Sequence, residues 1–137
     1  MGETSLPKIL VADDSASDRE LLRELFRGYS CAWFEATDGA DALSQVLLEE
    51  PDVLILDVRM PEFSGWEVCR AIRSRAGLSQ VRVLMLTSMG ARVNATTSPL
   101  FGADGYLDKP FDIDVMRSMV ASLVERNGRQ LRLPSDP

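Results

Sequence analysis

The sequence predicts an α/β fold in which helices cover both faces of a parallel sheet. Short apolar runs alternate along the chain with segments of helical periodicity, as expected of repeated strand–helix units. The run Val53–Leu56 is apolar throughout, which is typical of a strand buried on both faces. Several runs stop at polar residues, among them Asp13, Asp57 and Thr87. In such sheets, binding sites form beyond the carboxyl ends of the strands.

Five strands are expected, because five compact runs are rich in Ile, Leu, Val or aromatic residues. They are Lys8–Ala12, Cys31–Ala36, Val53–Leu56, Val81–Leu86 and a short run at Tyr106 and Leu107.

Helices are expected where apolar residues recur three or four positions apart. The first is Ser15–Gly28, with Ser15 as a candidate N-cap, and the second is Ala40–Glu49, ended by Pro51. The third follows Gly65, and the last begins at the N-cap Asp112. The apolar stripes of the last two are Val68, Cys69 and Ile72, and Val115, Met116, Met119, Val120, Leu123 and Val124.

The stretch between Thr87 and Asp104 predicts a fourth helix that is short, distorted or mobile. Residues 91–95 suit a helix, but Thr96, Thr97, Ser98 and Pro99 are poor helix formers. Beyond the last helix, the residues from Asn127 onward are polar and include prolines, so a frayed tail is expected.

Composition limits the classes of function. The 137 residues suit one domain, and the 45% of hydrophobic residues suffice for a core. The absence of histidine excludes imidazole catalysis and His-ligated metals, and the net charge of −6 disfavours direct binding of nucleic acid. No apolar run is long enough to span a membrane and no signal peptide is recognised, so a cytoplasmic protein without membrane contact is expected.

The polar residues at the strand ends predict one site. Asp13, Asp14, Asp57, Thr87 and Lys109 follow four different strands and should meet at the carboxyl edge of the sheet. Carboxylates gathered there repel one another, so a cation is needed, and Mg²⁺ suits hard oxygen ligands. A simpler interpretation is that the two adjacent acids only begin a helix. It does not account for the matching residues on the other strands.

With these residues in view, the chain resembles the response-regulator receiver domains of two-component signalling, over about residues 7–126. The matching motifs are ILVADDS at Ile9–Ser15, LILDVRMPEFSG at Leu54–Gly65, VLMLTS at Val83–Ser88 and GADGYLDKPF at Gly102–Phe111. The resemblance implies a flavodoxin-like doubly wound sheet with strand order 2-1-3-4-5 and five helices. It also divides the chain into an N-terminal extension (1–6), a receiver domain (7–126) and a C-terminal tail (127–137).

The resemblance implies a role for each residue at the acidic end of the site. Asp57 would be the phosphoacceptor. Asp14 would bind Mg²⁺ directly, Asp13 mainly through water, and Asp57 and the backbone carbonyl of Arg59 would complete the protein ligands.

Three further residues would bind the phosphoryl group or respond to its presence. Thr87 would donate its hydroxyl to one phosphoryl oxygen and Lys109 would pair with another. Tyr106 occupies the aromatic position that turns inward when Thr87 moves. The Lys109–Pro110 bond is typically cis in this family.

The function implied is a phosphoacceptor switch rather than a conventional enzyme. A histidine kinase or a histidine phosphotransfer protein would supply the phosphoryl group, a downstream protein would be the target, and a homodimer is one possible form. Two alternatives stay open: a pseudo-receiver scaffold that is not phosphorylated, and the receiver fragment of a larger hybrid kinase or regulator. An aspartyl phosphatase is disfavoured, because such enzymes commonly place a second acid where this chain has Arg59.

Overall fold

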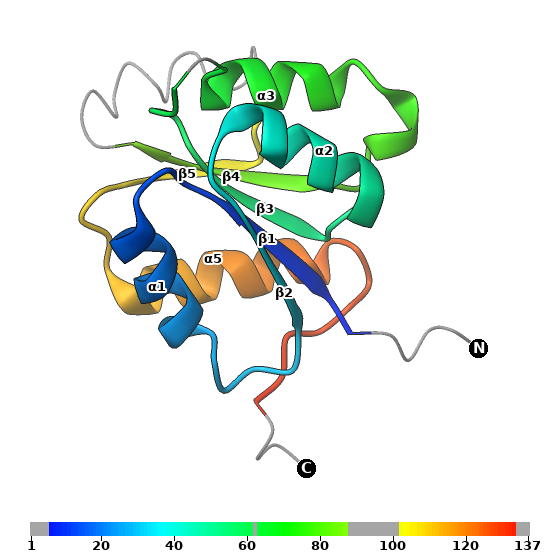
Figure 1. Cartoon of the computed structure of the whole chain (residues 1–137). Helices are drawn as coiled ribbons and strands as arrows, with labels where there is room; N and C mark the ends of the chain where they lie inside the picture. The colour runs from blue at the N-terminus through cyan, green and yellow to red at the C-terminus, as the bar shows by residue number, and fades with distance from the viewer. Residues whose placement is uncertain (1–5, 62, 88–101, 134–137) are drawn as a thin grey trace.

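The computed structural model describes residues 6–61, 63–87 and 102–133 (Figure 1). Five parallel strands form one sheet in the order β2-β1-β3-β4-β5, which confirms the predicted fold. The strands are β1 (Lys8–Ala12), β2 (Ala32–Ala36), β3 (Val53–Asp57), β4 (Arg82–Thr87) and β5 (Gly105–Asp108).

Helices cover the two faces of this sheet, with α1 and α5 on one side and α2 and α3 on the other (Figure 1). They are α1 (Ala16–Leu25), α2 (Gly39–Glu49), α3 (Gly65–Arg73) and α5 (Ile113–Glu125), with a 3₁₀ turn, η2 (Ala76–Leu78), before β4. The expected fourth helix lies outside the described residues. Within the described ranges, no helix is both long and apolar enough to cross a bilayer.

The strand register brings the predicted site residues level with one another. Ala12, the last residue of β1, pairs with Leu56 in β3, so Asp13 and Asp57 follow at the same height. On the other side of β3, Asp57 pairs with Leu86, and Thr87 pairs with Asp108 in β5. The polar ends of β1, β3, β4 and β5 therefore form one edge, as predicted.

The first helix ends earlier than predicted, at Leu25 rather than Gly28. Phe26 caps it, and the chain turns there so that the Tyr29 N–H donates to the Phe26 carbonyl. The Phe26 ring is 2% exposed and packs beside Trp33 at a centroid distance of 5.8 Å. Burial of this ring between α1 and β2 accounts for the early turn.

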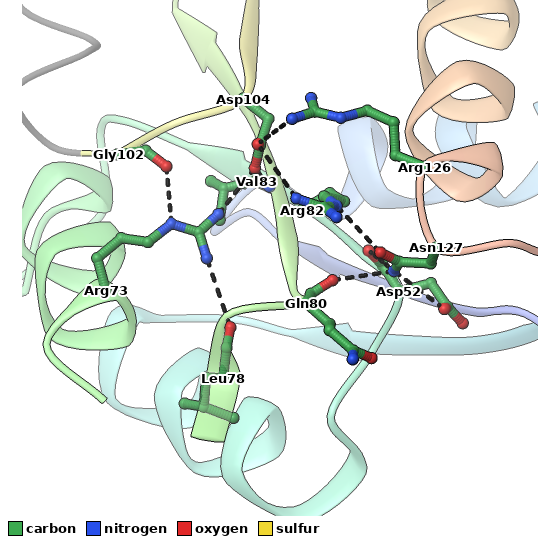
Figure 2. Close-up of polar contacts among 10 residues, drawn as sticks. All are labelled: Asp52, Arg73, Leu78, Gln80, Arg82, Val83, Gly102, Asp104, Arg126 and Asn127. Carbon is green, nitrogen blue, oxygen red and sulfur yellow. Dashed lines mark hydrogen bonds and ion pairs between the residues drawn. The ribbon is translucent and has the colours of Figure 1, made fainter. Parts of the chain in front are cut away.

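The prediction of a frayed tail is wrong for residues 127–133. The Asn127 amide donates to the Asp52 carboxylate at 3.2 Å and to the Gln80 carbonyl at 2.9 Å (Figure 2). Farther along, the Ser30 N–H donates to the Arg132 carbonyl at 2.7 Å in an antiparallel bridge. Asp52 is buried and needs hydrogen-bond donors, so this polar stretch folds back onto the domain instead of fraying.

A charge cluster at the opposite, amino edge of the sheet fixes the start of β5 (Figure 2). One oxygen of Asp104 accepts from Arg73 at 2.7 Å and from the Val83 N–H at 2.8 Å. The other oxygen faces Arg126 at 3.3 Å and Arg82 at 3.9 Å. One largely buried carboxylate thus joins α3, β4 and the end of α5 to β5, whose far end leads to Lys109.

Candidate functional site

Three carboxylates meet at the carboxyl edge of the sheet. Asp13 follows β1 and is 1% exposed, Asp57 ends β3 and is 5% exposed, and Asp14 is open to solvent. One oxygen of each lies within 4.8 Å of the other two. The Ser15 N–H donates to Asp13 at 2.9 Å and so orients that buried carboxylate toward the site.

Lys109 supplies the positive charge among these acids. It follows β5 directly, and its peptide bond to Pro110 is cis, as the resemblance implied. Its ammonium lies 2.9 Å from Asp13, 2.8 Å from Asp18 and 3.4 Å from Asp57. Asp18 is not among the site residues predicted from the sequence. Its position one helical turn beyond Ser15 was the signal that it could face the strand ends.

The electrostatics of Asp57 reflect its buried position. Burial raises the pKa of this carboxyl from 3.8 to about 6, against the lowering effect of the Arg59 N–H, which donates at 3.1 Å. The neighbouring charge of Asp13 raises this pKa further and that of Lys109 lowers it. The pKa of Lys109 is also raised, but for a different reason. Burial by itself would lower the pKa of this ammonium, and the negative charges of Asp18, Asp13 and Asp57 together hold it above its usual value.

We expect Asp57→Asn to be more stable than the wild type at pH 7 when no divalent cation is present. Folding raises the pKa of Asp57, so the folded state binds more protons between the unfolded and folded pKa values, and stability falls as pH rises through that window. Asparagine removes this penalty, which is at most about 3 kcal/mol.

Thermal unfolding in EDTA from pH 4 to pH 8 measures the effect. The advantage of Asp57→Asn should be greatest at the alkaline end and should shrink toward pH 4. An advantage that is the same at every pH would contradict a desolvated carboxylate at this position.

The donor atoms of the site suit Mg²⁺. They are carboxylate oxygens on three residues, and no softer ligand stands among them in the described part of the chain. Asp13, Asp14 and Asp57 would hold the ion through these oxygens, and its charge would offset their mutual repulsion. The three carboxylates line a cleft of about 270 Å³ together with Ser15, Asp18, Arg59 and Lys109. Arg59 is exposed at its rim.

Thr87 and Tyr106 lie on the neighbouring strands β4 and β5. Thr87 is 1% exposed, and its hydroxyl donates to Asp108 at 3.3 Å. Its carbonyl accepts from the Lys109 N–H at 2.6 Å, which ties the end of β4 to the lysine. Tyr106 is half-buried and packs on the side of the sheet that α2 and α3 cover. It therefore lies on a covered face of the sheet and is not among the residues that line the cleft, and its switching role stays a prediction.

Comparison with known families gives a match that covers most of the chain. Residues 9–121 match the model of the response regulator receiver domain. The response regulator MprA of Mycobacterium leprae is 38% identical over 87% of this chain, and a probable transcriptional regulator, ycf27, of Cyanophora paradoxa is 35% identical over 90%. The chain covers 51% of each, so it spans about half the length of these curated relatives.

Solved structures agree with these matches. The signal receiver domain of a putative LuxO repressor protein from Vibrio parahaemolyticus superposes with a TM-score of 0.84 at 26% identity, covering 90% of this chain and 93% of that one. The receiver domain of the Francisella response regulator 1452 superposes with a TM-score of 0.81 at 29% identity, covering 88% and 98%.

Proposed function

Because the chain belongs to the response regulator receiver domains, signalling switches that are phosphorylated on an aspartate, we propose that Asp57 is the phosphoacceptor. The observation that carries this proposal is the setting of that carboxylate. One oxygen is held by the Arg59 N–H, the other faces the Lys109 ammonium, and the side chain lies within reach of Asp13 and Asp14. Burial keeps bulk water from most of the group.

The residues of the site divide the chemistry among them. An Asp57 oxygen attacks phosphorus, the bond from phosphorus to the donor breaks, and its electron pair leaves with the donor. Asp13, Asp14, Asp57 and the Arg59 carbonyl would hold Mg²⁺, which supplies charge neutralisation for the phosphoryl oxygens when bound. Lys109 neutralises a further oxygen through a charge-assisted hydrogen bond.

The signal would pass from the phosphoryl group through Thr87. Its hydroxyl now bonds to Asp108, and a phosphoryl oxygen on the neighbouring strand end offers a charged acceptor instead. Movement of Thr87 would change the space next to β5 and let Tyr106 turn inward. A contact formed in the phosphorylated state alone shifts the equilibrium toward that conformation.

The partners follow from the family and from the length of the relatives. A phosphodonor kinase is the partner that receiver domains share, and here a histidine kinase or a histidine phosphotransfer protein would serve. A downstream protein would bind the switched surface, directly or through a homodimer, without nucleic acid or membrane contact by this domain, in the cytoplasm. Because the curated relatives are about twice as long, the chain would also suit a role as the receiver part of a larger regulator.

Phosphorylation by a small donor tests the acceptor. Acetyl phosphate with Mg²⁺ should add one phosphoryl group to the wild type, detected by intact mass, and none to Asp57→Asn. The matched control is Asp114→Asn, because the Asp114 side chain is 92% exposed at the start of α5 and should leave the modification unchanged. Modification that persists in Asp57→Asn would refute the acceptor. A wild type that stays unmodified would favour the scaffold alternative, and turnover of small phosphate esters would favour a phosphatase.

A further inference from the structure

Asp18 engages the lysine of the site although it does not belong to the strand ends. Its carboxylate accepts from the Lys109 ammonium at 2.8 Å, whereas Asp57 accepts from the same ammonium at 3.4 Å. Asp13 accepts at 2.9 Å, so the three donor hydrogens of the ammonium have three carboxylate partners. Any new acceptor for this ammonium therefore displaces or weakens an existing contact.

The start of α1 fixes the position of Asp18. The Asp18 N–H donates to the N-cap hydroxyl of Ser15 at 3.2 Å, which places the residue in the first turn of the helix. Arg19 donates to the Asp13 carbonyl at 2.8 Å and so anchors this turn to the end of β1. The carboxylate of Asp18 thus faces Lys109 because of the local fold, and a change of its charge need not move the helix.

We propose that Asp18 is a positioning residue that competes with the phosphoryl group for Lys109. The inference rests on Asp57 being the phosphoacceptor. Asp18 is the most exposed of the three partners of Lys109, with 37% of its side chain exposed, and it is outside the group of carboxylates that could share a metal. When a phosphoryl group occupies Asp57, Lys109 turns from Asp18 toward it, and the contact with Asp18 is lost.

The competition has opposite consequences for the two ligands of the site. Asp18 draws Lys109 away from Asp57, which leaves that carboxylate available to a cation, and its own negative charge attracts Mg²⁺. The same negative charge repels an anionic phosphoryl group and withholds Lys109 from it. Asp18 therefore favours Mg²⁺ binding and opposes phosphoryl binding. A residue that served only to begin the helix would not move the two affinities in opposite directions.

Ligand titrations of Asp18→Asn test this proposal. Mg²⁺ alone is titrated first, and then beryllofluoride, a phosphoryl analogue, at saturating Mg²⁺, both followed by tryptophan fluorescence or amide resonances. We expect Asp18→Asn to bind beryllofluoride about two- to fivefold more tightly and Mg²⁺ about twofold more weakly, as befits one partly exposed charge. Asp18→Glu, which keeps the charge, should stay close to the wild type in both titrations.

The matched control is Glu20→Gln. It removes one negative charge from an exposed position of α1, two residues from Asp18, and should leave both affinities nearly unchanged. Opposite shifts in Asp18→Asn, absent from Glu20→Gln, support the competition. Shifts of both affinities in the same direction, or no difference from Glu20→Gln, overturn it. Failure of the wild type itself to bind beryllofluoride with Mg²⁺ would instead overturn the proposed phosphoacceptor site.

Discussion

Gly65→Ala is expected to lower the free energy of unfolding by about 2–4 kcal/mol, since the site cannot accept a methyl group without moving main-chain atoms. A Cβ at this position would lie 2.4 Å from the Asp57 carbonyl oxygen and 2.8 Å from the Val58 Cα. Gly65 begins α3, and its N–H donates to the Val58 carbonyl at 3.0 Å. The close approach thus sets the start of α3 directly against the end of β3.

The atoms that must yield belong to Asp57 and its neighbour, so the substitution should also slow phosphorylation by acetyl phosphate in the fraction that remains folded. Urea unfolding measures the stability, and intact mass against time measures the phosphorylation rate. The control is Gly77→Ala in η2, where an added Cβ meets nothing within 4 Å. That variant should match the wild type or gain up to about 1 kcal/mol. Equal unfolding midpoints for the two variants would show that the close approach at Gly65 does not constrain the domain.

Asp104→Ala is expected to destabilise the domain by about 2–4 kcal/mol. Removing one member of a buried charge pair costs about 3–5 kcal/mol, and the partial exposure of the arginines reduces that figure. Alanine leaves Arg73, Arg82 and Arg126 facing one another without their common carboxylate. It also removes the acceptor of the Val83 N–H at the start of β4.

Two comparisons separate the contributions. Asp104→Asn keeps an oxygen for the Val83 N–H but lacks the charge, so its stability should fall between those of the wild type and the alanine variant. Asp114→Ala removes a carboxylate that is 92% exposed and paired with Arg117 at 3.6 Å, and it should cost no more than about 1 kcal/mol. Urea unfolding at low ionic strength is the measurement. An Asp104→Ala variant as stable as Asp114→Ala would mean that the cluster contributes no net stability.

The folding of this chain into a doubly wound sheet was predictable, because the pattern of apolar residues within each short segment indicates which faces of a strand or helix are buried. Lys8–Ala12 was predicted with the bounds that the structure shows, and β3 differs by one residue, since continuous apolar runs mark strands covered on both faces. The convergence of Asp13, Asp57 and Lys109 followed from the same pattern, because the ends of parallel strands share one edge. Neither step needed a measured distance.

Polar pairing between distant segments was not predictable in this way. Asn127 bonds to Asp52 across 75 positions of sequence, and the contact turned an expected frayed tail into a packed segment. The polar composition of the segment after α5 indicated that it would be exposed to solvent. Instead, the buried carboxylate of Asp52 accepts a hydrogen bond from Asn127 and holds the segment against the domain.

By itself, the sequence determined the sheet, the identity of its polar edge and the chemical class of the site, because apolar periodicity and strand direction are properties of short segments. Only the tertiary structure decided which carboxylates hold Lys109 and how closely Gly65 approaches Asp57. Those features depend on the angle and distance at which a helix packs against the sheet. Side-chain packing throughout the core sets that geometry, and it cannot be predicted from the pattern of residues in any one short segment of the sequence.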